Sequence, residues 1–371
     1  MVNKNMKNYL EFEKEIKNLE ENLDDLKSPF GTEGISEVDT DKIKNTQVQI
    51  NEKLKETYKN LNSWQKTLVA RHEDRPRANF YIKKIFESFT QLSGDRLFGD
   101  DKSVIAGFGL LSQKSVLVIG QEKGEDLNSR IERNFGMMRP EGYRKCVRLM
   151  QLANRFNIPV ITFVDTPGAY PGLGAEQRGQ ASAIASSIEC SMSLTVPNIS
   201  VIIGEGGSGG AIALASSNKV VMLENSIYSV ISPEGCASIL WRDQSKSLQA
   251  AEAMKLTAKD LLDLGIIDEI IDEPLGGAHR DPNLIAEDIK SALIENLKFF
   301  QGMSKNEIYD HRKSRFLKIG RDKGFAKSSQ TESGLGYKEP KYAKIVKNLN
   351  KNKFIYVGVI VAAIAAIILF I

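Results

Sequence analysis

The sequence predicts an α/β fold whose parallel strands present glycine-rich loops at one edge of a sheet. Residues 202–211 read IIGEGGSGGA, so an apolar run typical of a strand meets an alanine-rich run typical of a helix through five glycines. Residues 158–164 form a second apolar run, IPVITFV, which leads into DTPGAYPGLG at 165–174 and a helical pattern at 175–188. Two such units place their loops together at the carboxyl ends of parallel strands, where α/β proteins bind ligands.

The composition limits the classes of function that fit this chain. Its 371 residues suffice for one large domain or two, and 50 basic against 47 acidic residues leave a net charge of only +3. That balance gives no strong field for nucleic acid, so no nucleic-acid partner is required. The three cysteines lie far apart and only three histidines are present, so we expect no metal site and free thiols in a reducing compartment.

Residues 1–75 predict a helical extension at the N-terminus. A turn-rich break at 28–34 separates two helical patterns, and the second of these covers 46–70. We expect no signal peptide or transit peptide here, because the segment is acidic and lacks an apolar core. Apolar residues recur in the first pattern at alternating intervals of four and three, which marks one stripe of a helix: Phe12, Ile16, Leu19, Leu23 and Leu26.

Residues 76–300 predict the globular domain. Ser232 followed by Pro233 is a pair typical of the N-cap and first residue of a helix running toward Trp241. The other expected elements are a strand hairpin at 104–110 and 115–119, a polar surface loop at 121–139, a helix at 142–156, and short strands at 220–223 and 227–231.

The C-terminal part predicts a polar linker at 301–353 and a membrane tail anchor at 354–371. The last eighteen residues are uncharged and mostly apolar, and lysines precede them. As a helix they would be about 27 Å long, close to the roughly 30 Å of a bilayer core. A core helix reached through the linker is the alternative.

The glycines at 204–210 predict a row of backbone N–H groups at a helix start, which suits an anion. A nucleotide-binding P-loop is excluded because Gly210 is followed by Ala211 and no lysine follows. Residues 206–210 also match the Gly-x-Ser-x-Gly elbow of serine hydrolases and peptidases. In that alternative Ser208 is the nucleophile, His279 the base, and either Asp263 or Asp268 the carboxylate.

Backbone N–H groups without an evident base suit carboxyl transfer between a biotin ureido group and a thioester. Loss of the carboxyl group leaves the ureido oxygen negative, and removal of a proton from the acyl carbon makes an enolate. The biotin nitrogen accepts that proton, so no histidine is needed. Each well-aimed N–H donor lowers such a barrier by about 2.7–4 kcal/mol.

The chain resembles the carboxyltransferase α subunit of multi-subunit acetyl-CoA carboxylase over about residues 10–318. That resemblance implies a crotonase-like fold of stacked ββα units, with an N-terminal helical extension. It also implies an α2β2 heterotetramer in which a separate β subunit carries zinc, and a complex with biotin carboxylase and a biotin carboxyl carrier protein. The motifs that carry it are RNFGM at 133–137, PEGYRK at 140–145, DTPGAYPG at 165–172, GEGGSGG at 204–210 and SVISPEGCASILW at 229–241.

The resemblance also assigns roles to residues of the glycine motifs. It implies that the N–H groups of Gly209 and Gly210 are catalytic and bind the ureido oxygen of carboxybiotin. Gly206 and Gly207 shape the loop, and Gly168 and Ala169 line the same cleft. The matching hole for the acetyl-CoA enolate is expected mainly on the β subunit.

One motif departs from the family pattern. Where the family usually reads GHQKGR, this chain reads GQEKGE at 120–125, with Gln121 in place of histidine and Glu125 in place of arginine. If this loop meets the phosphates of CoA, the altered charge weakens the contact or moves it to Lys123 and Arg130. The family occurs in the bacterial cytoplasm and in plastids that encode this subunit, so both compartments fit.

Overall fold

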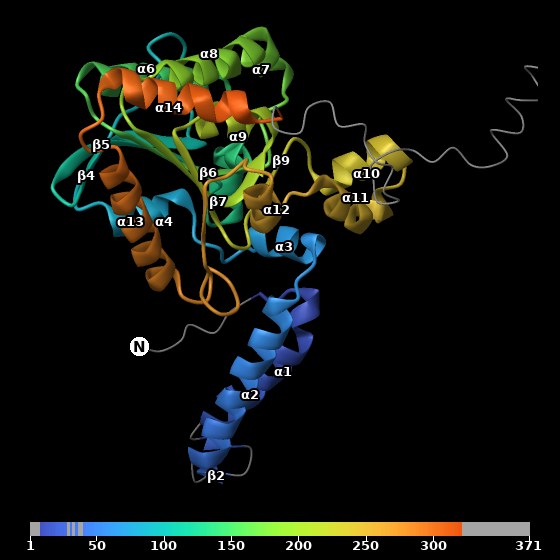
Figure 1. Ribbon diagram of the computed structural model, residues 1–371. Helices are drawn as coiled ribbons and strands as arrows, with labels where there is room; N and C mark the ends of the chain where they lie inside the picture. The colour runs from blue at the N-terminus through green and yellow to red at the C-terminus, as the bar shows by residue number, and fades with distance from the viewer. Residues whose placement is uncertain (1–7, 28–29, 32–33, 36–39, 321–371) are drawn as a thin grey trace, which may run out of the picture.

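The computed structural model describes residues 8–27, 30–31, 34–35 and 40–320, and its centre is an eight-stranded sheet with helices on both faces (Figure 1). The central strands run parallel, and an antiparallel pair extends one edge. The order across the sheet is β10 (Glu269–Ile271), β8 (Lys219–Leu223), β7 (Asn198–Gly207), β6 (Val160–Thr166), β5 (Lys114–Gln121), β4 (Val104–Leu111) and β3 (Phe89–Gln91), with β9 (Ile227–Ser229) beside the end of β7.

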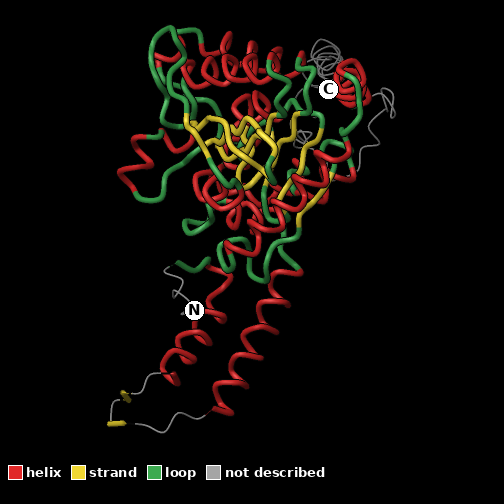
Figure 2. The backbone as a smooth tube through the Cα atoms, turned by 90° about the vertical axis from the view of Figure 1, so that its left-hand side faces the viewer, coloured by secondary structure: helices red, strands yellow, loops and turns green. Residues whose placement is uncertain are grey.

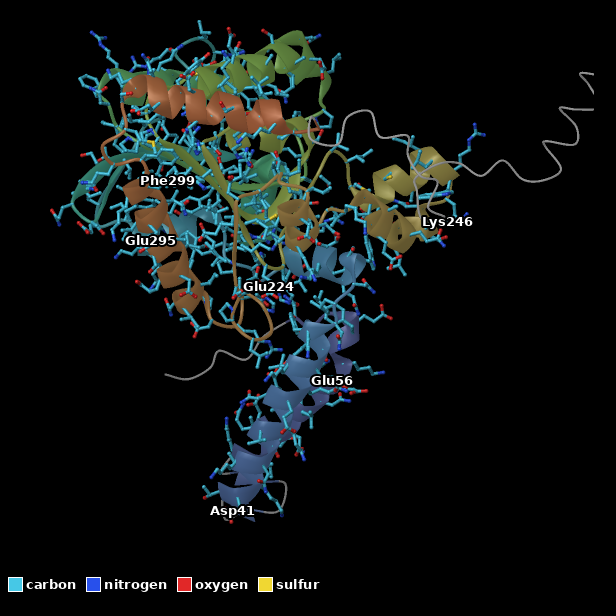
Figure 3. The ribbon with its side chains drawn as sticks, in the orientation of Figure 1. Asp41, Glu56, Glu224, Lys246, Glu295 and Phe299 are labelled. Carbon is cyan, nitrogen blue, oxygen red and sulfur yellow. The ribbon has the colours of Figure 1, made fainter. Side chains whose placement is uncertain are left out.

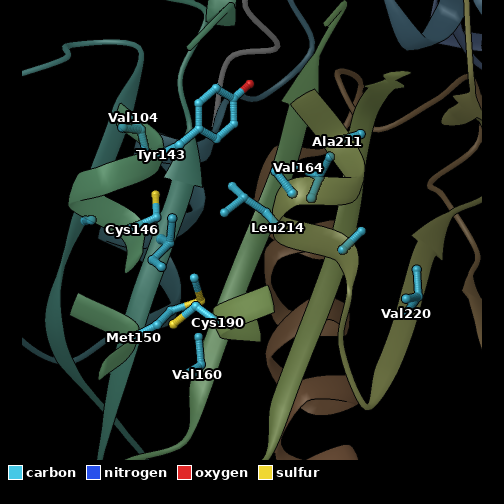
Figure 4. Close-up of a cluster of buried hydrophobic side chains, with 14 of the residues drawn as sticks. Val104, Tyr143, Cys146, Met150, Val160, Val164, Cys190, Ala211, Leu214 and Val220 are labelled. Atoms are coloured by element: carbon cyan, nitrogen blue, oxygen red, sulfur yellow. The ribbon is translucent and has the colours of Figure 1, made fainter. Parts of the chain in front are cut away.

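Alternating apolar residues let the strands bury both faces. On β6, Val160 and Val164 face one core and Ile161 and Phe163 face the other. The first core packs under α6 (Pro140–Arg155), α8 (Gln180–Ser193) and α9 (Ser208–Ala215), as Figure 4 shows. The second packs under α4 (Ala78–Ile85) and α13 (Pro282–Phe299). The predicted α/β class is therefore confirmed, with a helical layer on each side of the sheet.

Several predicted elements match the structure closely. The hairpin is β4 and β5, and the helix predicted at 142–156 is α6, which starts two residues earlier at a proline. The hydroxyl of Ser232 accepts a hydrogen bond from the N–H of Gly235 at 3.1 Å, so it caps α10 (Pro233–Trp241) as expected.

Three predictions about loops and their flanking elements are wrong in detail. Glycines 204, 206 and 207 belong to β7, because the strand continues through Gly207 and pairs there with β9. The helix expected at 175–188 is divided into α7 (Leu173–Gln177) and α8 by Gly179, whose φ is 81°. The stretch predicted as a polar loop contains α5 (Leu127–Glu132) and the 3₁₀ turn η2 (Asn134–Gly136).

The N-terminal extension is a helical hairpin that projects from the body (Figures 1 and 2). After η1 (Glu11–Glu13), α1 (Lys14–Lys27) packs against α2 (Thr40–Lys59), with Ile16 and Leu23 of the predicted stripe buried against Ile50 and Leu54. Asp41 lies at the free end of the hairpin (Figure 3). The short strands β1 (Phe30–Gly31) and β2 (Gly34–Ile35) pair between the two helices.

The body begins earlier than the predicted boundary at residue 75. Helix α3 (Ser63–Ala70) already packs on it, because Ala70 is buried with Ala251 of α11 (Ser247–Met254) and with Leu256. The 3₁₀ turn η3 (Gln244–Lys246) joins α10 to α11, and α12 (Ala258–Asp263) follows.

The polar linker predicted from residue 301 is also wrong over its first part. Residues there form α14 (Lys305–Lys318), which lies over the upper helical layer in Figure 1. Its Arg312 is fully buried and donates to the carbonyls of Leu194 and Val196 and to the side chain of Asn218. The remainder of the linker and the predicted anchor at 354–371 lie outside the described residues. Among the residues that the structure describes, no helix is both long and apolar enough to cross a bilayer.

Candidate active site

The two glycine-rich segments meet at one edge of the sheet, where β6 and β7 end side by side. A Cβ atom on Gly210 would lie 2.6 Å from the carbonyl carbon of Gly168 and 2.9 Å from the nitrogen of Ala169. A Cβ atom on Gly207 would lie 2.2 Å from the carbonyl oxygen of Pro167. Only glycine allows the backbones to approach this closely, so both segments line a single candidate site.

The start of α9 is partly exposed at this edge. The helix begins directly after β7, and no side chain caps its N-terminus. Ser208, with φ of 52°, turns the chain from strand to helix and is exposed. A Cβ atom on Gly168 would meet nothing within 4 Å. Since the first N–H groups of a helix have no carbonyl partner within it, this turn suits an approaching anion.

The opposite end of α9 is held by buried hydroxyl groups. Ser200 donates to the carbonyl of Leu214 at 2.8 Å, and the hydroxyl of Thr162 lies 2.7 Å from that of Ser200 and 3.1 Å from the same carbonyl. From α8, Ser187 donates to the carbonyl of Ala213 and Ser191 to that of Ser216, each at 2.8 Å. These donors satisfy carbonyls at the negative end of the helix dipole, so they fix the helix that presents the N–H groups.

A buried ion network lies beneath the glycine segments and joins β6 to β7. The Asp165 carboxylate is 2.7 Å from the Lys123 ammonium and 3.2 Å from the Arg77 guanidinium, and it accepts the N–H of Glu205 at 3.0 Å. The Glu205 carboxylate is 3.2 Å from Lys123 and 2.7 Å from Arg71. Burial would raise the pKa of Asp165, but Lys123 and Arg77 reverse this and hold that pKa below its ordinary value.

The positions of Lys123 and Arg130 differ from the sequence-based expectation. Lys123 is buried and its ammonium is already paired with two carboxylates, so it is not free to bind a phosphate. Arg130, on α5, donates to the backbone carbonyl of Glu73 at 3.4 Å and keeps a partly exposed side chain.

Gly206 packs against the ring of Tyr228, where a Cβ atom would lie 2.9 Å from the ring.

The structure places Gln121 at the site, which the sequence analysis did not predict. It ends β5 and is fully buried, so it does not line a loop that could meet CoA. Its side-chain nitrogen donates to the carbonyl of Gly210 at 2.8 Å, and its side-chain oxygen accepts the N–H of Asp165 at 3.1 Å. The sequence offers one signal, a polar residue at the end of an otherwise buried strand.

The hydrolase alternative is not favoured. His279 is buried and stacks on His72 with ring centroids 3.9 Å apart, and Asp268 accepts a hydrogen bond from Arg315 at 2.9 Å. The third histidine, His311, lies on α14 beside Asn218. Throughout the described ranges, no histidine hydrogen-bonds to Ser208, so this serine lacks the base that a nucleophile needs.

The chain matches one protein family over most of its length. The acetyl co-enzyme A carboxylase carboxyltransferase-like family model covers residues 9–320. The acetyl-coenzyme A carboxylase carboxyl transferase subunit alpha of Pelagibacter ubique is 63% identical over 359 residues, which are 96% of this chain and 98% of that protein. The protein of the same name from Zymomonas mobilis is 52% identical over 316 residues, which are 85% of this chain and 100% of that protein.

Solved structures support the crotonase-like fold. A transcarboxylase 12S structure with hydrolysed methylmalonyl-coenzyme A bound aligns with a TM-score of 0.51 and 18% identity, covering 64% of this chain and 45% of that one. A Pseudomonas malonate decarboxylase hetero-tetramer in complex with coenzyme A gives a TM-score of 0.51 and 15% identity, covering 66% of this chain and 98% of that one. Together with the family match, these findings show that the chain belongs to the acetyl-CoA carboxylase carboxyltransferase family, as an alpha subunit.

Proposed function

We propose that the first turn of α9 binds the ureido oxygen of carboxybiotin while its carboxyl group passes to acetyl-CoA, giving malonyl-CoA for fatty acid synthesis. The observation that carries this proposal is the uncapped start of α9, where Ser208 is exposed and Gly209 half-buried, next to Gly168, at which a Cβ atom would meet nothing within 4 Å. The carboxybiotin arrives on a separate biotin carboxyl carrier protein, charged by biotin carboxylase. Both it and acetyl-CoA are substrates.

The chemistry needs donors aimed at developing negative charge. The bond between the biotin nitrogen and the carboxyl carbon breaks, and the ureido oxygen gains charge that the N–H groups of Gly209 and Gly210 stabilise. The methyl carbon of acetyl-CoA loses a proton to the biotin nitrogen and bonds to the carboxyl carbon. Gly206 and Gly207 shape the turn, and Gly168 and Ala169 line the cleft. Donors of this kind are worth roughly a hundredfold or more in rate.

The other half of the site is assigned to the β subunit. We infer an α2β2 heterotetramer. In it, the β subunit supplies the oxyanion hole for the acetyl-CoA enolate and carries the zinc. Within this chain, Arg130 is the candidate contact for CoA phosphates, whereas Lys123 holds the ends of β6 and β7 in place. The matched relatives are bacterial, which favours a bacterial cytoplasm, with membrane contact through residues 354–371.

Two glycine-to-alanine substitutions test this assignment. Gly210→Ala forces a methyl group into the backbone of Gly168 and should reduce carboxyl transfer by about a hundredfold or more, since small misplacements are costly in a preorganised site. Gly99→Ala is the matched control, because a Cβ atom on Gly99 would meet nothing within 4 Å and Gly99 lies outside the two glycine segments. We expect that control to keep activity within about threefold, equivalent to roughly 0.7 kcal/mol.

The assay uses the complex reconstituted with its β subunit and a carboxybiotin donor. Assembly is verified by size before rates are compared. Equal activity of the two variants in assembled complexes would show that the first turn of α9 does not bind the reacting group.

A further inference from the structure

Gln121 joins the three segments that form the proposed site. It lies on β5, Asp165 ends β6, and Gly210 belongs to the first turn of α9. Its amide makes one hydrogen bond to each of the other two segments, at 2.8 Å to the Gly210 carbonyl and 3.1 Å from the Asp165 N–H. The side chain is fully buried, so water does not replace either bond if the amide is removed.

The bond to Gly210 is separate from the ion network. Lys123, Arg77 and Arg71 act on the carboxylates of Asp165 and Glu205, which fix the strand ends. Among the side chains of the described residues, only Gln121 donates a hydrogen bond to the backbone of the first turn of α9. The orientation of that turn relative to β6 therefore depends on this one amide as well as on backbone packing.

We propose that Gln121 is a positioning residue that locks the first turn of α9 to the end of β6, so that the N–H groups of Gly209 and Gly210 keep a fixed aim. This inference rests on the proposed function for its effect on rate. Gln121 touches neither substrate. It acts through the Gly210 carbonyl, and it does so by supplying one neutral donor and one acceptor at the same time.

That requirement predicts how substitutions behave. Gln121→Met is close in volume but supplies neither bond, and Gln121→Glu supplies only the acceptor while ionised. Gln121→His supplies both as a neutral imidazole, with one ring nitrogen donating and the other accepting. A protonated imidazole has two donors and no acceptor, so it leaves the Asp165 N–H without a partner.

The rate experiment uses the reconstituted complex over a pH series. We expect Gln121→Met to lower kcat for carboxyl transfer by about 10- to 100-fold, since the reacting groups lose alignment, with the KM for acetyl-CoA within about twofold. Gln121→His should restore kcat to within about threefold of the original chain at pH 8. Its activity should then fall relative to the original chain as the pH drops through the pKa of the new histidine.

A second measurement does not depend on activity. Amide hydrogen exchange of a peptide covering residues 205–215 should be at least about tenfold faster in the Gln121→Met complex, because the first turn of α9 opens more readily. Val48→Ala, at an exposed side chain on α2 of the N-terminal hairpin, is the control and should leave exchange unchanged.

The outcomes separate this inference from the proposed function. Slower turnover with faster exchange, both rescued by histidine at high pH, supports the positioning role. Unchanged exchange and a kcat within twofold for Gln121→Met overturn it. If the original complex transfers no carboxyl group while exchange still accelerates in the methionine variant, the proposed function fails and the link between Gln121 and α9 stands. If the methionine variant does not fold, a flat pH profile of Gln121→His relative to the original chain overturns the inference.

Discussion

At the scale of single residues, Ser208 lies where the nucleophile of a strand–turn–helix elbow would lie. Its positive φ and exposure match that geometry, but its hydroxyl has no histidine partner among the described residues. In our proposal, the backbone N–H groups of the same turn bind the ureido oxygen of carboxybiotin. We therefore expect the side chain of Ser208 to be dispensable for carboxyl transfer and the neighbouring N–H groups to be required.

Ser208→Ala tests this distinction directly. The substitution removes the hydroxyl and keeps every N–H donor, so carboxyl transfer should persist within about tenfold, equivalent to roughly 1.4 kcal/mol. The measurement is turnover of the reconstituted complex. A loss of more than a thousandfold in a folded protein, with labelling by a serine-reactive phosphonate, would instead establish the hydrolase alternative.

His279 gives a residue-scale prediction about pH. Burial, then the charges of His72, Arg75 and Arg280, lower its pKa to about 2, against an ordinary 6.5. Below pH 6.5 the unfolded chain binds a proton that the folded chain does not, so stability falls as the pH drops. Lowering the pH from 8 to 5.5 should cost about 1.4 kcal/mol through this residue alone.

His279→Phe should make that dependence shallower, because it keeps an aromatic ring over His72 without a titrating group. Urea unfolding at pH 8 and pH 5.5 measures the difference for both chains. An identical loss of stability in the two chains would contradict a neutral buried His279.

At the scale of elements, α9 is fixed at both ends by polar side chains from its neighbours. Gln121 holds its first turn, and hydroxyl groups from β6, β7 and α8 hold its last turn. The helix has only eight residues and is nearly all apolar or small, so intrinsic helix stability contributes little. Its alignment therefore comes from buried hydrogen bonds, each of which is costly to leave unmade.

Ser200→Ala should lower the free energy of unfolding by about 1–3 kcal/mol, since the Leu214 carbonyl loses a donor and Thr162 loses an acceptor in a dry core. Ser238→Ala is the matched control on an exposed hydroxyl that donates to Glu234, and it should cost less than about 0.5 kcal/mol. Denaturant unfolding compares them. Equal costs would show that the hydroxyls around α9 are incidental.

At the scale of the whole molecule, α14 completes the described body. Arg312 fills the space under α14 by donating to carbonyls at the end of α8 and to Asn218, so a chain without α14 leaves these groups buried and unpaired.

Two truncations separate the roles of α14 and the C-terminal extension. A chain ending at residue 320 should assemble and transfer carboxyl groups as the full chain does, whereas one ending at residue 302 should melt several degrees lower or fail to fold. If residues 354–371 are an anchor, the full chain should stay with membranes through high-salt and carbonate washing, and the shorter chain should be released. Full-length protein in the soluble fraction of its own cells, without detergent, would rule out the anchor.

The sequence by itself determined the α/β class, the hairpin, the cap at Ser232 and the two glycine segments, because these depend on local periodicity and on residue types with strong backbone preferences. The resemblance to a family supplied the activity. The sequence did not determine that glycines 206 and 207 end a strand or that Lys123 is buried in an ion network. Nor did it determine that α14 forms where a linker was expected. Those outcomes depend on neighbours far away in the chain: β9 pairs with β7, Asn218 and the end of α8 accept from Arg312, and Asp165 and Glu205 meet Lys123. Only the tertiary structure brings Gln121 from β5 to the first turn of α9, since a single buried amide has no periodic pattern from which its partners could be read.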